Sequence, residues 1–265
     1  MSFTDTHTHL YLEQFKDDLD TVIENAISGG VNRLFFPAIN SNYTDLMLDL
    51  KKKYPENIFL MSGLHPCYVS SDYLKEIRHV ENIIHSNDIV AVGEIGIDLH
   101  WDKTNLDIQI KAFEAQISLA NDHDLPIVIH CRQSFDEIYD VLIKNKVKNG
   151  GIFHCFSGNL DEAKKILDLG MKLGIGGVVT FKNGKIDKFL NQIDISNIVL
   201  ETDSPYLSPY ISSKESNITS EMKHLNKPAY LTEIAKTLAK HRNQTYDHIC
   251  DITYKNYMNF FGTDK

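Results

Sequence analysis

The amino-acid sequence predicts an α/β fold, a single-domain (β/α)8 TIM barrel spanning residues 1–265. Short runs rich in Val, Ile and Phe alternate with longer amphipathic stretches. The runs are continuously apolar, which is typical of strands buried on both faces of a parallel sheet. There are eight runs, and the chain has the length expected of eight strand–helix units. The alternative, a doubly wound open sheet, usually has fewer strands at this length and a glycine-rich first turn. The sequence contains no GxGxxG motif.

The expected strands follow one another at fairly even spacing. They are residues 3–7, 31–38, 58–65, 89–96, 126–131, 151–156, 171–176 and 197–202. Between them, residues 11–30 carry apolar side chains at helical spacing and end at a double glycine. Residues 105–124 show a similar apolar stripe, and residues 159–170 begin with a cap and end at a glycine. Two more helices are expected at 228–242 and 245–262.

Composition limits the classes of protein that the chain could represent. Apolar residues make up 42% and charged residues 24%, as in ordinary globular proteins. No apolar run approaches the roughly 20 residues of a membrane helix, and the first residues do not form a signal peptide. We therefore expect a cytoplasmic protein with no membrane association and no obligate protein partner. The net charge of -9 repels nucleic acid at long range, so a polyphosphate substrate would need a local attraction such as bound divalent cations.

The four cysteines, Cys67, Cys131, Cys155 and Cys250, form no CxxC pair. This spacing indicates neither a structural zinc site nor a disulfide framework. We expect reduced thiols, and we expect Cys131 and Cys155 to pack in the barrel wall.

Six possible metal ligands lie where predicted strands end, and the carboxyl ends of barrel strands meet at one mouth. They are His7, His9, Glu94, His130, His154 and Asp203. In an extended chain, residues i and i+2 point to the same side, so His7 and His9 could bind one cation together. An HxH pair alone is a weak signal, and a histidine near a strand end is often a satisfied polar group. The combination with later histidines and two carboxylates indicates a metal site.

The size and mixture of this set favour two divalent ions. Six ligands exceed the four of a tetrahedral zinc site. A mixed imidazole and carboxylate set suits two ions bridged by a carboxylate and a water-derived hydroxide. Zn, Mn, Fe or Co would be compatible, and Mg could also occupy such a site although it prefers oxygen ligands.

Six motifs, in order, give the chain a family resemblance. They are "DTHTHL", "GLHP", "VGEIGIDLHWDK", "PIVIHCR", "FHCFSG" and "ETDSPYLSP". With them the chain resembles the TatD-type metal-dependent deoxyribonucleases of the amidohydrolase superfamily, from residue 4 to the C-terminal helix. The resemblance implies a barrel hydrolase of phosphodiesters, commonly a 3′-to-5′ exonuclease on DNA that uses a metal-bridged hydroxide. Its substrate would be single-stranded DNA or frayed DNA ends.

The resemblance also implies roles for the six residues. His7, His9, Glu94 and Asp203 would bind one ion, and Glu94, His130 and His154 the second. Glu94 would bridge the ions, and Asp203 would orient the hydroxide and carry its proton. Glu94 and Asp203 are thus the expected catalytic residues.

The segment 205–230 departs from the family pattern. It is longer than a compact barrel needs, which is typical of a lid or a substrate-binding flap. Lys223, His224 and Lys227 stand where arginines are expected. A lysine offers a positive charge to a phosphate but no bidentate fork, so substrate preference is less closely defined than the chemistry.

Further residues are candidate substrate contacts, each with an ordinary structural alternative. His65 could hydrogen-bond a phosphate or a metal ligand, or be a buried structural histidine. Arg132 could clamp a phosphate or form a surface ion pair. Ser157 and Gly158, expected to open a helix, could bind an anionic oxygen or simply cap that helix. Trp101 and Tyr206 could stack on a base or anchor their loops.

Three functions compete at this stage. The first is the two-metal phosphodiesterase. The second is an amidohydrolase-type ester or amide hydrolase, such as a D-aminoacyl-tRNA deacylase. Such enzymes often have a carboxylated lysine at the place where this chain has Glu94. The glutamate therefore favours the phosphodiesterase. The third is a metal-storing or scaffold protein, against which Asp203 argues, since storage needs no proton carrier.

Overall fold

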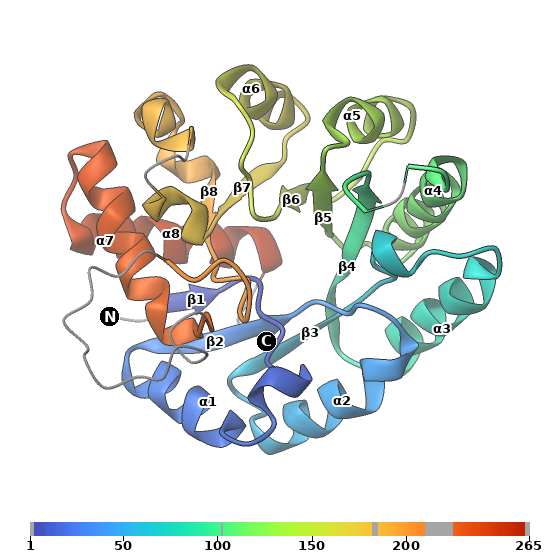
Figure 1. The fold of residues 1–265 in the computed structure, drawn as a ribbon, viewed down its shortest axis with the longest axis horizontal. Coiled ribbons are helices and arrows are strands. Elements are labelled where there is room, and N and C mark those ends of the chain that lie inside the picture. Colours follow the sequence, from blue (N-terminus) through green and yellow to red (C-terminus); the bar gives the residue numbers. More distant parts are fainter. Residues whose placement is uncertain (1–2, 102, 182–184, 210–224, 263–265) are drawn as a thin grey trace. The chain divides into compact units, whose positions relative to one another are not determined.

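The computed structural model describes residues 3–101, 103–181, 185–209 and 225–262. Among these residues, eight strands follow one another in the sheet order β1 to β8, and all the pairings resolved between them are parallel (Figure 1). This is the strand order of a (β/α)8 barrel, so the predicted fold class is confirmed and the doubly wound order is excluded.

Every predicted strand is present, with adjusted ends. The strands are β1 (Phe3–Asp5), β2 (Val31–Phe36), β3 (Ile58–Ser62), β4 (Ile89–Asp98), β5 (Ile127–Arg132), β6 (Gly151–Phe153), β7 (Lys172–Ile175) and β8 (Ile198–Leu200). The α-helices are α1 (Leu19–Ser28), α2 (Thr44–Lys53), α3 (Tyr73–Ser86), α4 (Leu106–Asp122), α5 (Phe135–Lys144), α6 (Leu160–Asp168), α7 (Leu231–Arg242) and α8 (Tyr246–Phe261).

The first predicted helix is shorter than expected. Residues 13–15 form a separate 3-10 turn, and α1 begins only at Leu19. Three of its apolar side chains, Val22, Ile23 and Ala26, are buried. The predicted helical spacing of apolar residues is therefore confirmed for the second half of the segment 11–30. The helix ends at Ser28, and Gly29 of the predicted double glycine is its C-cap.

The chain divides into two compact units. Unit 1 comprises Met1–Phe35, Cys155–Lys164 and Leu173–Lys265, and unit 2 comprises Phe36–His154 and Lys165–Lys172. That the whole chain is a single domain stays a prediction.

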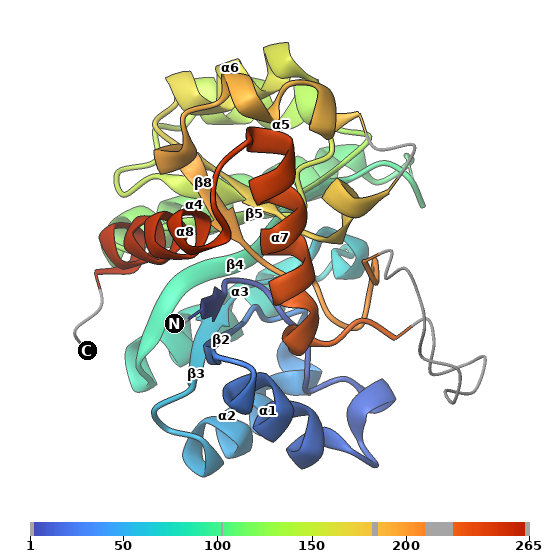
Figure 2. The same cartoon turned by 90° about the vertical axis from the view of Figure 1, so that its left-hand side faces the viewer.

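In unit 1, helices α7 and α8 pack on each other and on β8 (Figure 2). The side-chain amide of Asn256 on α8 donates to the carbonyl of Ile195 at 2.6 Å and of Ile198 at 2.7 Å. These bonds satisfy backbone groups at the start of β8 and fix the strand against the helix. The start of β8, the strand that leads toward Asp203, is therefore held by a buried side chain of α8.

In unit 2, helix α4 packs against β4, and α4 and α5 lie outside β4 and β5 in Figure 1. In the β4–β5 register, Gly96 is opposite His130. A Cβ atom at Gly96 would lie 2.1 Å from the His130 carbonyl oxygen, and its φ is +140°. Only glycine fits this position, because both the close approach and the backbone conformation exclude a side chain.

No helix within the described residues has both the length and the apolar character needed to cross a membrane.

Candidate metal centre

The six predicted ligands form two clusters in the structure, one in each unit. We call His7, His9 and Asp203 the first donor set, and Glu94, His130 and His154 the second donor set. Five of the six residues are less than 9% exposed, and only His130 is more accessible.

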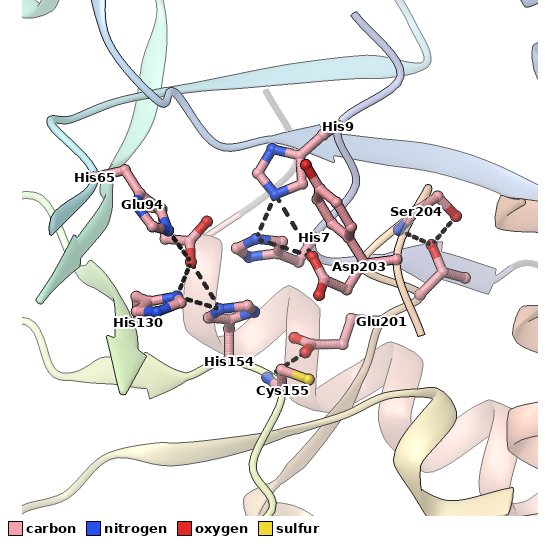
Figure 3. Close-up of polar contacts among 12 residues, drawn as sticks. His7, His9, His65, Glu94, His130, His154, Cys155, Glu201, Asp203 and Ser204 are labelled. Atoms are coloured by element: carbon pink, nitrogen blue, oxygen red, sulfur yellow. Dashed lines mark hydrogen bonds and ion pairs between the residues drawn. The ribbon is translucent and has the colours of Figure 1, made fainter. Parts of the chain in front are cut away.

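The first donor set converges on a small volume in unit 1 (Figure 3). Nε2 of His7 lies 3.2 Å from Nε2 of His9. Oδ1 of Asp203 lies 3.8 Å from the first nitrogen and 3.5 Å from the second. Nδ1 of His9 lies 2.8 Å from the hydroxyl of Tyr11, a contact that can orient the ring while leaving Nε2 to a cation.

Backbone pairing beyond the strands places these residues. The expectation that His7 and His9 end a strand is corrected, because β1 ends at Asp5. The segment after it still pairs with the segment after β8: His9 N donates to Ser204 O at 2.7 Å, and Asp203 N donates to His7 O at 2.9 Å. Asp203 itself has a φ of +59°, a left-handed conformation that aspartate tolerates better than most residues.

Asp5, one of the buried carboxyl groups of unit 1, ties β1 to the end of β8. Its two oxygens accept hydrogen bonds from the backbone N–H and the hydroxyl of Thr202, at 2.8 and 2.5 Å. Burial raises the pKa of Asp5 to about 8, although these hydrogen bonds act in the opposite direction. Asp5 therefore serves to hold the backbone that carries His7.

The second donor set meets at one oxygen of Glu94 (Figure 3). Oε1 of Glu94 lies 2.7 Å from Nδ1 of His130 and 2.7 Å from Nε2 of His154. The two histidine nitrogens are 3.4 Å apart. Burial alone would lower the pKa of His130, but its contacts with Asp98 and Glu94 outweigh burial and raise it.

Of the three strands that carry this set, β4 and β5 extend slightly further than expected and only β6 ends earlier. Glu94 and His130 lie within β4 and β5, but β6 ends at Phe153, directly before His154. The next residue, Cys155, has a φ of +47°, which breaks the extended chain. His154 keeps its place because its N–H donates to the carbonyl of Ile129 on β5, at 3.1 Å.

His65 contacts the second donor set as a hydrogen-bond donor. β3 ends at Ser62, not at His65 as expected, and His65 instead caps a 3-10 turn at 66–68. Its Nδ1 accepts the N–H of Cys67 at 3.0 Å, so in the neutral ring the proton is on Nε2. That Nε2 lies 3.5 Å from Oε1 of Glu94. His65, Glu94 and His130 also form a potential metal-binding group, but the position of the proton favours the role of a donor for His65.

The atoms of the donor sets lie within a few tenths of an ångström of the spacing that a shared divalent cation requires. Ligand atoms about 2.1 Å from one ion lie about 3.0–3.4 Å apart in octahedral or tetrahedral geometry. The spacings are 3.2–3.8 Å in the first set and 2.7–3.4 Å in the second. Imidazole and carboxylate together suit Zn or Mn as well as Co.

Two expectations about neighbouring residues need correction. Helix α6 begins at Leu160 and is capped by Asn159, whose Oδ1 accepts the N–H groups of Asp161 and Glu162 at 2.9 and 3.0 Å. Ser157 and Gly158 therefore do not open the helix. Cys155 is not a strand residue, and its N–H donates to the carboxylate of Glu201, which is fully buried.

The remaining candidates are exposed or partly exposed side chains. The guanidinium carbon of Arg132 lies 5.4 Å from the centre of the Trp101 ring, and Trp101 is 73% exposed. Tyr206 is 48% exposed, with its ring 6.0 Å from that of His9. Lys227 pairs with Asp18 at 3.4 Å, whereas Lys223 and His224 lie outside the described residues, as does most of the segment 205–230. All four cysteines are unbridged, as expected.

Sequence reasoning missed Asp98, whose Oδ2 lies 2.9 Å from Nε2 of His130. The signal was available, because Asp98 follows Glu94 by four residues along one strand and such residues share a face. Burial would raise the pKa of Asp98, but hydrogen bonds from His130 and from the N–H of His100 hold it below its usual range. Asp98 is therefore ionised.

These features define a (β/α)8 protein with clustered imidazole and carboxylate ligands, the class of the metal-dependent hydrolases. The family model described as "TatD related DNase" matches residues 4–262, and the chain belongs to this family. A protein of Bacillus subtilis described as the uncharacterized metal-dependent hydrolase YabD is 31% identical, over 97% of this chain and 98% of its own length. A Rahnella protein named 3′-5′ ssDNA/RNA exonuclease TatD is 29% identical, over 96% of each chain.

Among solved structures, the TatD homologue YjjV of Escherichia coli superimposes with a TM-score of 0.89. The two sequences are 26% identical, and the match covers 98% of each chain. The likeness confirms the family and the fold.

Proposed function

We propose that this metal-dependent hydrolase is a nuclease that removes nucleotides from the 3′ end of single-stranded DNA or frayed DNA ends. The observation that carries the proposal is the pair of donor sets, each with two imidazoles and one carboxylate at ligand spacing. Relatives named as 3′-5′ ssDNA/RNA exonucleases support the reaction and the substrate class.

Each donor set would hold one divalent ion, Zn, Mn, Mg or Co. Such ions would supply Lewis acidity, which lowers the pKa of a coordinated water and offsets negative charge on the phosphate. That Glu94 bridges both ions remains part of the proposal. It follows from the family resemblance.

The chain's own residues then have defined tasks. The Asp203 carboxylate accepts the proton of the water that attacks phosphorus in line with the leaving 3′-oxygen. His65, with its proton on Nε2, donates to a phosphate oxygen or to Glu94. Arg132 pairs with a phosphate of the adjoining nucleotide, and Ser157 remains a candidate contact.

Exposed aromatic side chains support a nucleic acid substrate. Among the described residues, the large exposed aromatic side chains are Tyr68, Trp101 and Tyr206. Each ring lies close to a histidine ring in a segment that carries site residues. The distance between ring centres is 6.2 Å from Tyr68 to His65, 4.8 Å from Trp101 to His100 and 6.0 Å from Tyr206 to His9. Bases of a single strand stack on such rings with little sequence preference.

The test uses protein stripped with EDTA and supplied with Mn, Mg, Zn or Co. The substrates are single-stranded DNA and RNA labelled at the 5′ end, a p-nitrophenyl phosphodiester, and an aminoacyl ester. We expect a ladder of 5′-labelled DNA products that shortens from the 3′ end, and loss of the ladder with Asp203→Asn despite an unchanged circular dichroism spectrum. Hydrolysis of the aminoacyl ester without cleavage of any phosphodiester would overturn the proposal in favour of an ester hydrolase.

The cytoplasmic location and the lack of an obligate protein partner stay predictions.

A further inference from the structure

The carboxylate of Asp98 links two parts of unit 2. Asp98 ends β4 and is 2% exposed. One oxygen, Oδ2, lies 2.9 Å from Nε2 of His130. The other, Oδ1, accepts the N–H of His100 at 2.8 Å and the N–H of Trp101 at 3.4 Å. A single carboxylate thus contacts both a residue of the second donor set and the turn that carries the exposed tryptophan.

A buried glutamine fixes the position of Asp98. The N–H of Asp98 donates to Oε1 of Gln109 at 2.8 Å, and Nε2 of Gln109 donates back to the Asp98 carbonyl at 3.1 Å. Gln109 lies on α4 and is 1% exposed. Because both backbone groups of Asp98 are held by one side chain, its carboxylate has little freedom to turn away from His130.

This contact determines which nitrogen of His130 carries the proton when a cation occupies the second donor set. An ionised carboxylate only accepts hydrogen bonds, so Nε2 of His130 must donate to Asp98. In the metal-free protein Glu94 competes for a proton on Nδ1, so a cation in the second donor set is what leaves the Nδ1 lone pair free to act as a ligand. That Nδ1 atom lies 2.7 Å from Oε1 of Glu94 and 3.4 Å from Nε2 of His154, on the side where the donor set converges.

We propose that Asp98 is a positioning residue with two separable tasks. Oδ2 keeps the proton on Nε2 of His130 and so keeps Nδ1 available to a cation. Oδ1 seats the turn of His100 and Trp101 and so fixes the ring over which Arg132 lies. The first task rests on the proposed function, since it assumes that the second donor set binds metal. The second task does not depend on that assumption.

The two tasks can be separated by two substitutions. In Asp98→Asn the amide oxygen can still accept the N–H groups of His100 and Trp101, while the NH2 group takes the place of Oδ2. That group donates to Nε2 of His130, so the ring proton moves to Nδ1, which can then no longer bind a cation. Asp98→Ala removes both sets of hydrogen bonds.

The first measurement is the tautomer of His130 in the Zn²⁺-loaded protein, from the ¹⁵N chemical shifts of its ring. A His130→Gln spectrum identifies its signals among those of the twelve histidines. We expect the proton on Nε2 in the wild type and on Nδ1 in Asp98→Asn. The same tautomer in both proteins would overturn the proposal, whatever the protein hydrolyses.

The second measurement is the affinity for Mn²⁺ alone by calorimetry. Asp98→Asn should bind about 10–100-fold more weakly, as is usual when the partner of a ligating histidine is lost. Cys67→Ala is the matched control, because it removes only a 3.5 Å thiol contact to Oδ2 of Asp98 and leaves His130 in place. Its affinity should stay close to that of the wild type. Equal affinities in Asp98→Asn and the wild type would refute the first task.

The third measurement is fluorescence, since Trp101 is the only tryptophan of the chain. Asp98→Ala should shift the emission and increase quenching by iodide, because the turn loses both hydrogen bonds, whereas Asp98→Asn should resemble the wild type. Wild-type fluorescence in Asp98→Ala would refute the second task.

Discussion

The Nε2 atoms of His7 and His9 lie 3.2 Å apart, although strand β1 ends at Asp5. The extended backbone continues past the strand because the segment after β8 pairs with it. Two neutral imidazoles can face each other at this distance either by sharing a proton or by directing both lone pairs at one cation. The nearby Asp203 oxygen favours the cation.

Replacing either histidine should therefore remove metal from the first donor set. We expect His7→Gln to lower hydrolysis at least about 100-fold and to reduce bound metal, measured by mass spectrometry after dialysis. His85→Gln is the matched control, because the His85 ring also packs edge-on against a second histidine, His123, at 4.6 Å between ring centres, but belongs to neither donor set. Equal metal loss in both variants would contradict the assignment.

Glu94→Ala tests the proposed bridge. The variant should abolish hydrolysis and retain about one ion per chain or less, because Oε1 of Glu94 contacts both histidines of the second donor set. Metal content and circular dichroism are measured on the same sample. Two ions retained in a folded variant would refute the bridging role of Glu94.

The contact between Arg132 and Trp101 should appear as coupled effects on substrate binding. Arg132→Ala should raise the KM for an oligonucleotide more than the KM for a small phosphodiester, because only the oligonucleotide offers an adjoining phosphate. In a double-mutant cycle with Trp101→Ala the two effects should not add, since each variant removes the same stacked pair.

Lys165→Ala is the control for that cycle. Lys165 lies 5.1 Å from the Tyr139 ring centre, a similar stacked pair formed between helices α5 and α6. Its removal should leave both KM values unchanged. An equal rise in KM for the two substrates with Arg132→Ala would argue against a phosphate clamp.

Gly174 and Gly176 provide a matched pair for stability. A Cβ atom at Gly174 would lie 2.2 Å from Oε2 of Glu201, a fully buried side chain that accepts the Cys155 N–H. Gly174→Ala should lower the free energy of unfolding by about 1–3 kcal/mol, the usual cost of overpacking.

At Gly176 the added atom would meet its nearest neighbour at an ordinary 3.5 Å. Gly176→Ala should therefore change the unfolding free energy much less in the same urea titration. Similar losses at both positions would show that Glu201 can move aside.

Stability should fall at alkaline pH through Cys250. Burial raises the pKa of this thiol from 9.0 to about 11. Between these values the folded chain holds a proton that the unfolded chain has lost, so a rise in pH favours unfolding. The melting temperature of the wild type should therefore fall toward that of Cys250→Ala as the pH is raised from 9.0 to about 11. Parallel curves would contradict the assigned pKa.

The sequence by itself determined the fold class and singled out the candidate ligands. Continuous apolar runs require burial on both faces, and their number and spacing define a (β/α)8 chain. The HxH spacing places His7 and His9 on one side of an extended backbone, because that rule is local and needs no knowledge of distant residues.

The tertiary structure decided where each strand stops and which atoms the ligands present. Strand ends depend on partners far along the chain, as the pairing of His9 with Ser204 shows. The proposed role of Nδ1 in His130 as the cation-facing atom depends on Asp98, a carboxylate from the neighbouring strand. Sequence patterns give the direction of a side chain from its own backbone, but the rotation of a ring and the location of its proton follow from the groups that surround it.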